Sequence, residues 1–145
     1  MGSVKSLGLA AICAVEMSAC CPSFSSVNKP ADESYALICF GEESEREHYF
    51  CKARENSRKM RYEDADDNLR RALRSKGARI SDAEIYLELG IVNYENAKSI
   101  HIFPAQRIYF LEAAAAYLRQ SAVSGELKKR KSVYEQAVWS SRVAR

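Results

Sequence analysis

Apolar and polar positions alternate with a helical period through most of the chain after Glu42. Between residues 61 and 73, apolar or small residues stand three or four positions apart, which is typical of an amphipathic helix. Similar stripes run through 86–94, 111–118 and 127–145. The pattern predicts an all-α fold in which antiparallel helices are joined by short loops.

Several residues have the chemistry that begins or ends a helix. Ser44 and Glu47 have the spacing of a capping box, in which each side chain binds a free amide of the first turn. Gly77 can end one helix, and Ser81 or Asp82 can cap the next. These positions predict a loop over residues 75–81.

Small residues recur at a spacing that brings two helices close together. Ala65, Leu69 and Ala72 follow the pattern Ala-x3-Leu-x2-Ala, and Ala53 lies 12 positions before the first of them. This arrangement resembles a tetratricopeptide repeat, a hairpin of two helices in which small residues allow close approach. The resemblance implies that the helix around Ala53 packs against the helix around Ala65.

A second stretch is similar to the first helix of the next repeat, with the pattern Tyr86-x2-Leu89-Gly90-x3-Tyr94. Its partner helix is expected to carry Ala113 and Tyr117, after an apolar insertion at 100–104. The resemblance implies antiparallel helical hairpins of two tetratricopeptide-like repeats, followed by a C-terminal capping helix over 127–145. A helical bundle without repeats is the alternative.

The N-terminus has the layout of an export signal. Lys5 precedes about ten small and apolar residues, which is typical of a secretory signal and too short for a membrane-spanning helix. The sequence Met17-Ser-Ala-Cys20 resembles the lipoprotein box of bacteria. That resemblance implies removal of residues 1–19 and acylation of Cys20.

Two other interpretations of the N-terminus stay open. The apolar run could instead be a buried first helix of a cytosolic protein, or Gly2 could be myristoylated with palmitoylation of Cys20 and Cys21. Residues 22–30 are rich in Ser and Pro and are typical of a flexible spacer. The preferred division is a signal peptide at 1–19, a lipid-anchored tether at 20–31, and one helical domain at 32–145.

The remaining cysteines suggest a crosslink. An exported chain meets an oxidising compartment, and Cys39 and Cys51 stand 12 positions apart. We expect a disulfide between them. A metal site built from Cys39, His48 and Cys51 is the alternative, but no Cys-x-x-Cys pair supports it. We therefore predict no metal and no other cofactor.

Composition and charge narrow the class of partner. The chain is 47% hydrophobic and 28% charged with a net charge of +3, which indicates an ordinary globular domain. Acidic and basic residues form separate blocks, which suit docking to a protein better than binding to nucleic acid. We therefore expect no nucleic-acid partner. The basic run Lys128-Lys129-Arg130-Lys131 is expected to contact lipid head groups or other anions. The alternative is a solvated face. The run is expected in the loop before the last helix, because cations disfavour a helix N-terminus.

No catalytic motif is visible, and we predict that the chain is not an enzyme. It has no phosphate-binding loop, nucleophile elbow or His-Glu-x-x-His helix. His48 and Cys51 could form a dyad, but no third residue is placed to orient the base. A cell-wall hydrolase is therefore the least favoured function.

These observations lead to one functional expectation. The chain is expected to be an envelope-anchored lipoprotein of the outer membrane facing the periplasm, and a protein-interaction module or scaffold within a secretion or pilus apparatus. Oligomers fit this role. Tyr49, Tyr86, Asn93 and Tyr94 are the expected partner-binding residues. The alternative is a soluble cytosolic adaptor or chaperone with reduced cysteines.

Overall fold

The computed structural model describes residues 35–41, 44–99 and 103–144, which belong to one compact unit, Ser34–Arg145. The expected signal peptide, Cys20 and the tether lie outside the described residues. A short helical stretch at 35–40 comes first. It is followed by α3 (Glu45–Arg58), α4 (Tyr62–Arg74), α5 (Asp82–Ser99), α6 (Pro104–Gln120) and α7 (Gly125–Val143). The described part of the chain contains no strand, and the predicted all-α fold is confirmed.

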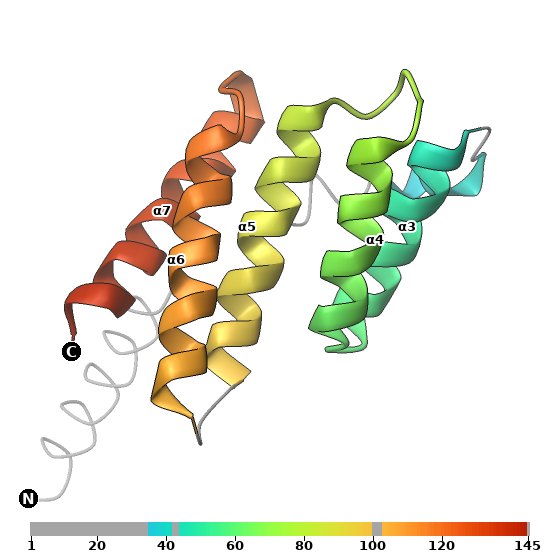
Figure 1. Ribbon diagram of the computed structural model, residues 1–145. Coiled ribbons are helices and arrows are strands. Elements are labelled where there is room, and N and C mark those ends of the chain that lie inside the picture. Colours follow the sequence, from blue (N-terminus) through green and yellow to red (C-terminus); the bar gives the residue numbers. More distant parts are fainter. Residues whose placement is uncertain (1–34, 42–43, 100–102, 145) are drawn as a thin grey trace, which may run out of the picture. The chain divides into compact units, whose positions relative to one another are not determined.

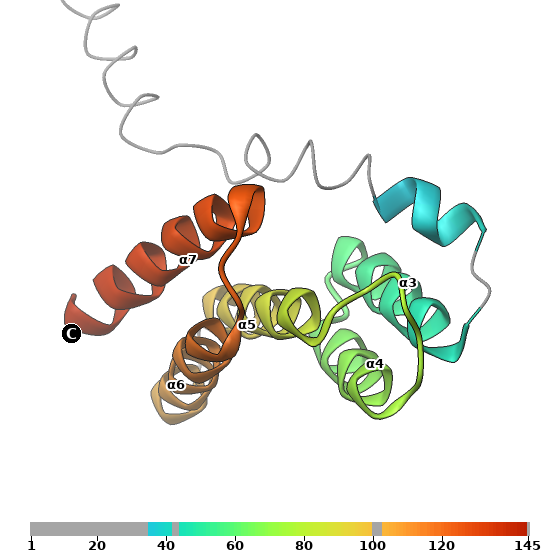
Figure 2. The same ribbon diagram turned by 90° about the horizontal axis from the view of Figure 1, so that it is seen from above.

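The five long helices pack mainly against their neighbours in the chain. Helices α3 and α4 form one antiparallel hairpin, and α5 and α6 form a second (Figure 1). Helix α7 packs on α6 and also reaches α5. Seen from above, α3 and α7 lie to one side of α5, while α4 and α6 lie to the other (Figure 2). Helix α5 is therefore the central element of the domain.

Small residues allow the helices of each hairpin to approach closely. Ala53, Ala65 and Ala72 are buried between α3 and α4, as the repeat pattern predicts. In the second hairpin, a Cβ atom added to Gly90 would lie 2.7 Å from the side chain of Leu118. No side chain fits between α5 and α6 at that point.

The apolar stripe expected over 111–118 forms the buried face of α6, but the two repeat positions lie one residue away from it. Ala114 and Leu118 are fully buried, while Ala113 and Tyr117 are only partly buried. Leu118 takes the close-packed place because it faces Gly90. Tyr117 instead lies at the edge of the helix pair, where its polar hydroxyl need not be buried.

The insertion expected near residues 100–104 is accommodated partly by long helices. Helix α5 has 18 residues and α6 has 17. Pro104 occupies the first turn of α6, where the missing amide hydrogen of proline costs no hydrogen bond. Residues 100–102 lie outside the described part of the chain.

Candidate functional site

Two of the expected partner-binding residues lie inside the domain. The ring of Tyr94 packs edge-on against Tyr134 of α7, with centroids 6.1 Å apart. The side chain of Asn93 donates hydrogen bonds to Asp66 Oδ1 and to the Leu89 carbonyl, both at 2.8 Å. Both residues are buried. They hold α5 against α4 and α7, so the surface role expected for them is not kept.

The other two expected residues are half-buried and belong to different helices. Tyr86 of α5 stacks on Tyr117 of α6, with an angle of 20° between the rings. Arg70 places its guanidinium 5.7 Å from the Tyr117 centroid. Tyr49 of α3 lies under Arg71, at 5.8 Å. The four predicted residues therefore do not form one exposed patch.

An ion cluster that the sequence analysis missed joins three helices. Glu88 of α5 lies 2.9 Å from Arg54 of α3 and 2.7 Å from Arg130 of α7. Burial alone would raise the pKa of Glu88, but the two guanidinium groups hold it below its ordinary value. The carboxylate therefore stays charged and serves as a structural anchor. Its signal in the sequence is one acidic residue within the mostly apolar run 85–92.

The short helical stretch at 35–40 covers this cluster. Tyr35 is buried, and its hydroxyl donates to Glu84 at 3.3 Å. The guanidinium of Arg54 stacks on the Tyr35 ring at 4.6 Å from the centroid. Burial and then the carboxylates of Glu88 and Glu84 raise the Tyr35 pKa above its ordinary value. Tyr35 therefore acts as a packing residue and does not ionise near neutral pH.

Cys39 and Cys51 are brought together in the structure. Their sulfur atoms are 2.05 Å apart and their Cα atoms 5.5 Å apart, which is the spacing of a disulfide. The bond ties the stretch 35–40 to α3, beside a cavity of about 520 Å³. Paired sulfurs cannot act as thiolate ligands, and the described residues contain no cluster of three or more metal-ligand candidates.

The basic run before the C-terminus is divided between two environments. Lys128 and Lys129 are exposed, whereas Arg130 is buried against Glu88. Lys131 donates to the Ser121 carbonyl at 3.2 Å. The run lies within α7, which begins at Gly125, and not in a preceding loop as expected. A helix turns its residues to different sides, so Arg130 cannot share an anion contact with Lys128 and Lys129.

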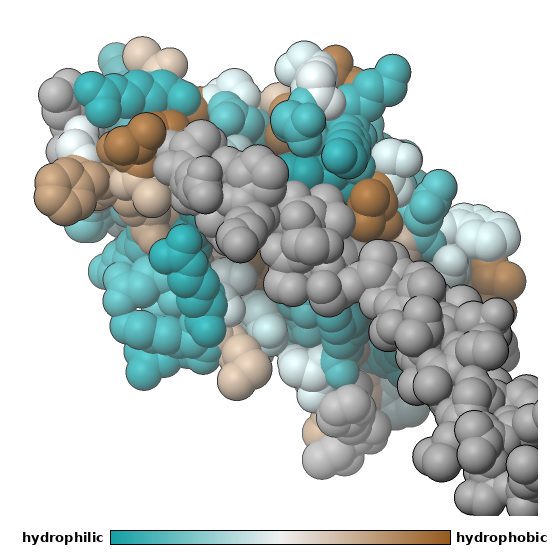
Figure 3. Space-filling view, turned by 180° about the vertical axis from the view of Figure 1, so that it is seen from behind, coloured by the Kyte–Doolittle hydropathy of each residue, from teal (hydrophilic) through white to brown (hydrophobic). Residues whose placement is uncertain are grey.

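Large apolar side chains are exposed at several places in the described region. They are Leu37, Phe40, Met60, Phe103, Ile108, Tyr109, Val123, Trp139 and Val143. Apolar side chains form separate spots among hydrophilic ones on the face drawn in Figure 3. An exposed apolar side chain alone therefore does not mark an interaction surface, and a neighbouring cavity or charged side chains are needed as well.

The surroundings of Trp139 form the best candidate for a binding site. A cavity of about 140 Å³ between α6 and α7 is lined by Leu118, Val138 and Trp139. Trp139 is 64% exposed, so it forms an open wall of the cavity. Arg119 and Arg142 also line it. The site thus combines an apolar hollow with two cationic side chains, a composition typical of the centre of protein interfaces.

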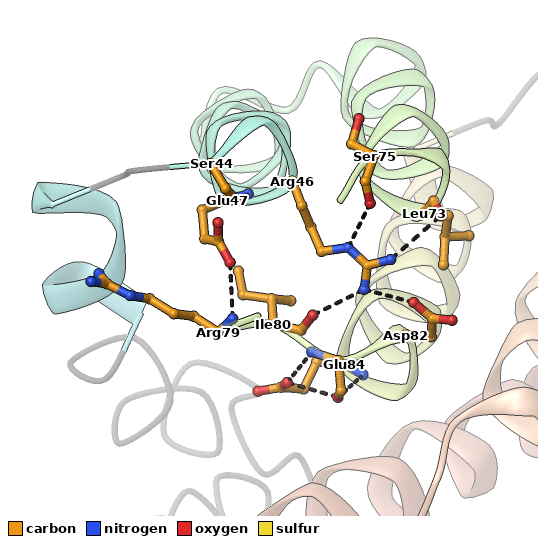
Figure 4. Close-up of polar contacts among 10 residues, drawn as sticks. Ser44, Arg46, Glu47, Leu73, Ser75, Arg79, Ile80, Asp82 and Glu84 are labelled. Atoms are coloured by element: carbon orange, nitrogen blue, oxygen red, sulfur yellow. Dashed lines mark hydrogen bonds and ion pairs between the residues drawn. The ribbon is translucent and has the colours of Figure 1, made fainter. Parts of the chain in front are cut away.

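A second polar cluster binds the loop between α4 and α5 (Figure 4). Arg46 donates to the carbonyls of Ser75 and Ile80 and pairs with Asp82 at 2.7 Å. All of these acceptors belong to the loop and the start of α5. Arg46 is therefore engaged in holding the loop on α3.

Glu47 also belongs to this loop cluster. Its carboxylate accepts from the Arg79 amide at 3.0 Å (Figure 4). The Ser44 side chain still caps α3 by accepting from the Glu47 amide, so the predicted capping box forms only in part. A Cβ on Gly77 would lie 2.6 Å from Ser44 Oγ. Gly77 thus provides close approach, while α4 ends earlier, at Arg74.

The start of α5 has a complete capping box. Ser81 and Glu84 exchange hydrogen bonds, from the Ser81 amide to the carboxylate at 2.8 Å and from the Glu84 amide to Ser81 Oγ at 3.3 Å (Figure 4). A cap was expected at Ser81 or Asp82, and Ser81 supplies it.

None of the helices in the described ranges is long and apolar enough to cross a bilayer. The comparisons with known proteins add no relative: no family model, no curated protein and no solved structure matches the chain.

Proposed function

We propose that the chain is a lipid-anchored interaction module of the bacterial envelope, whose helical domain binds another protein through the surface around Trp139. The observation that carries the binding role is the exposed indole of Trp139 beside an apolar cavity. Large aromatic side chains are costly to leave in water and are enriched where proteins bind one another. The buried ion cluster and the loop network hold the helices together. The surface around Trp139 is therefore the best candidate for binding a partner.

The envelope location rests on the chain before the helical domain. The box around Cys20 resembles a lipoprotein signal, and residues 22–30 suit a flexible spacer. The geometry of Cys39 and Cys51 supports an oxidising compartment. In this proposal the lipid determines the location, the tether provides reach, and the helices bind.

The proposed place of action is the periplasmic face of the outer membrane. A module of this size would scaffold a larger complex, such as a secretion or pilus apparatus, and oligomers fit that role. Lys128 and Lys129 are exposed and would lie near anionic head groups if the domain approaches the bilayer. The alternative, a cytosolic adaptor, predicts an unprocessed N-terminus and free thiols at Cys39 and Cys51.

Membrane fractionation of a Cys20→Ser variant tests the anchor. The wild-type protein and a matched Cys21→Ser variant should stay with membranes after washing with high salt, because acyl chains resist salt. The Cys20→Ser variant should be lost from that fraction. Retention of Cys20→Ser with the salt-washed membranes would contradict the lipoprotein proposal.

A further inference from the structure

We propose that the cavity between α6 and α7 binds one apolar side chain from an acidic segment of a partner protein. The inference rests on the proposed function as an interaction module and specifies the chemistry of the partner. Helix α6 contributes Leu118 and Arg119 to the cavity, and α7 contributes Val138, Trp139 and Arg142. The proposed partner segment thus carries one apolar side chain that enters the cavity, with carboxylates on either side of it.

The volume of the cavity determines the size of the anchor. It measures about 140 Å³, and a cavity of roughly 150 Å³ holds a benzene-sized group. One Phe or Leu side chain would therefore fill it. Val138 and Leu118 form a buried floor, with exposed fractions of 2% and 0%, and Trp139, which is 64% exposed, forms the open wall.

The charges around the cavity determine the sign of the partner. Arg119 and Arg142 form no ion pair with any residue of the described ranges. Glu135, also in the lining, faces Lys131 at 3.7 Å. The two guanidinium groups are thus available to carboxylates, and arginine is well suited to bind them.

Two other occupants fit the site less well. In a symmetric contact between two copies, residues of one copy meet different residues of the other, so the arginines would need carboxylates from the same surface. The cavity lining offers Glu135, which already faces Lys131 at 3.7 Å. An anionic membrane would favour a face of several exposed apolar side chains without a carboxylate. Here a hollow with Glu135 on its lining lies beside Trp139. A segment that inserts one side chain fits the hollow better.

Trp139 is the only tryptophan of the chain, so its fluorescence reports on this site alone. The purified full-length protein is titrated with a synthetic peptide that carries one Phe between two pairs of Glu. We expect the Trp139 emission to move to shorter wavelength and to saturate, because the indole leaves water. A peptide with Lys in place of each Glu should cause no shift.

A charge reversal makes the test specific. The double variant Arg119→Glu, Arg142→Glu should bind the Glu peptide at least about tenfold more weakly, since two attractive pairs become repulsive. The Trp139 emission of this double variant should move to shorter wavelength when the Lys peptide is added. Arg107→Glu, an exposed change elsewhere on α6, should bind as the wild type does. Circular dichroism spectra establish that the variants keep the helical fold.

The inference is overturned if neither peptide shifts the emission, or if both shift it equally. It is also overturned if phosphatidylglycerol vesicles alone produce the shift, or if the shift follows protein concentration without peptide. Failure here leaves the Cys20 fractionation result unaffected. A failed anchor test, in turn, leaves peptide binding measurable, so the two proposals fail separately.

Discussion

Glu88 joins α3, α5 and α7 through two buried ion pairs. It is 6% exposed and contacts one guanidinium from α3 and one from α7. A buried ion cluster adds little net stability over apolar packing, but loss of one member leaves the others uncompensated. The sequence shows Glu88 as an isolated charge in an apolar run, but not that Arg54 and Arg130 meet it, because both are distant in the chain.

Replacing this carboxylate should destabilise the domain. Glu88→Gln removes the negative charge and leaves Arg54 and Arg130 facing each other in the interior. We expect the free energy of unfolding to fall by about 3 kcal/mol, as measured by denaturant titration. Glu55→Gln on α3 is the matched control, because Glu55 is exposed and pairs with the exposed Lys59. Equal effects of the two variants would contradict the structural role of Glu88.

The same carboxylate predicts how stability depends on pH. Its pKa is lower in the folded domain than in the unfolded chain, where it is about 4.3. The stability that it contributes is therefore present above about pH 4.3 and lost as pH falls through the lower, folded value. Unfolding curves at decreasing pH should show this loss in the wild type and a shallower one in Glu88→Gln. Parallel profiles would contradict the pKa direction.

At the scale of elements, small residues predicted the hairpins better than aromatic residues predicted the surfaces. Ala53 and Gly90 were expected at close helix contacts, and both lie there. In α6 the expected apolar stripe is buried at Ala114 and Leu118. The repeat positions Ala113 and Tyr117 lie beside it, because alanines at 113–116 fit the small position equally well. The aromatic Tyr94 was expected outside and is buried. Sequence period alone does not show which face a central helix such as α5 covers, because it is surrounded on several sides.

Gly90 tests the contact between α5 and α6. Gly90→Ala improves helix propensity by about 1 kcal/mol, yet its new methyl group would overlap Leu118. We expect overpacking to prevail, with a net loss of about 1–2 kcal/mol in the free energy of unfolding. Gly41→Ala is the control, because among the described residues a Cβ there would meet just the end of the Arg79 side chain, at 3.9 Å. A Gly90→Ala variant more stable than the wild type would contradict the packing described for this hairpin.

For the molecule as a whole, the fold class was predictable and the proposed binding surface was not. The helical period and the small residues predict hairpins from local sequence. The cavity beside Trp139 depends on how α7 crosses α6, and no local pattern specifies that crossing. The net charge of +3 likewise does not show that Arg130 is buried or that two surface arginines lie at one site. The structure is needed to separate the buried arginine, which stabilises the fold, from the surface arginines, which are available to a partner.

We propose above all that a processed, lipid-bearing N-terminus carries the helical domain. The most direct measurement is the intact mass of the protein isolated from bacterial membranes without reduction. We predict a chain that begins at Cys20, with added acyl mass and two hydrogens fewer than the reduced form for the Cys39–Cys51 bond. A mass equal to the full 145-residue chain, with no acyl group, would contradict the account.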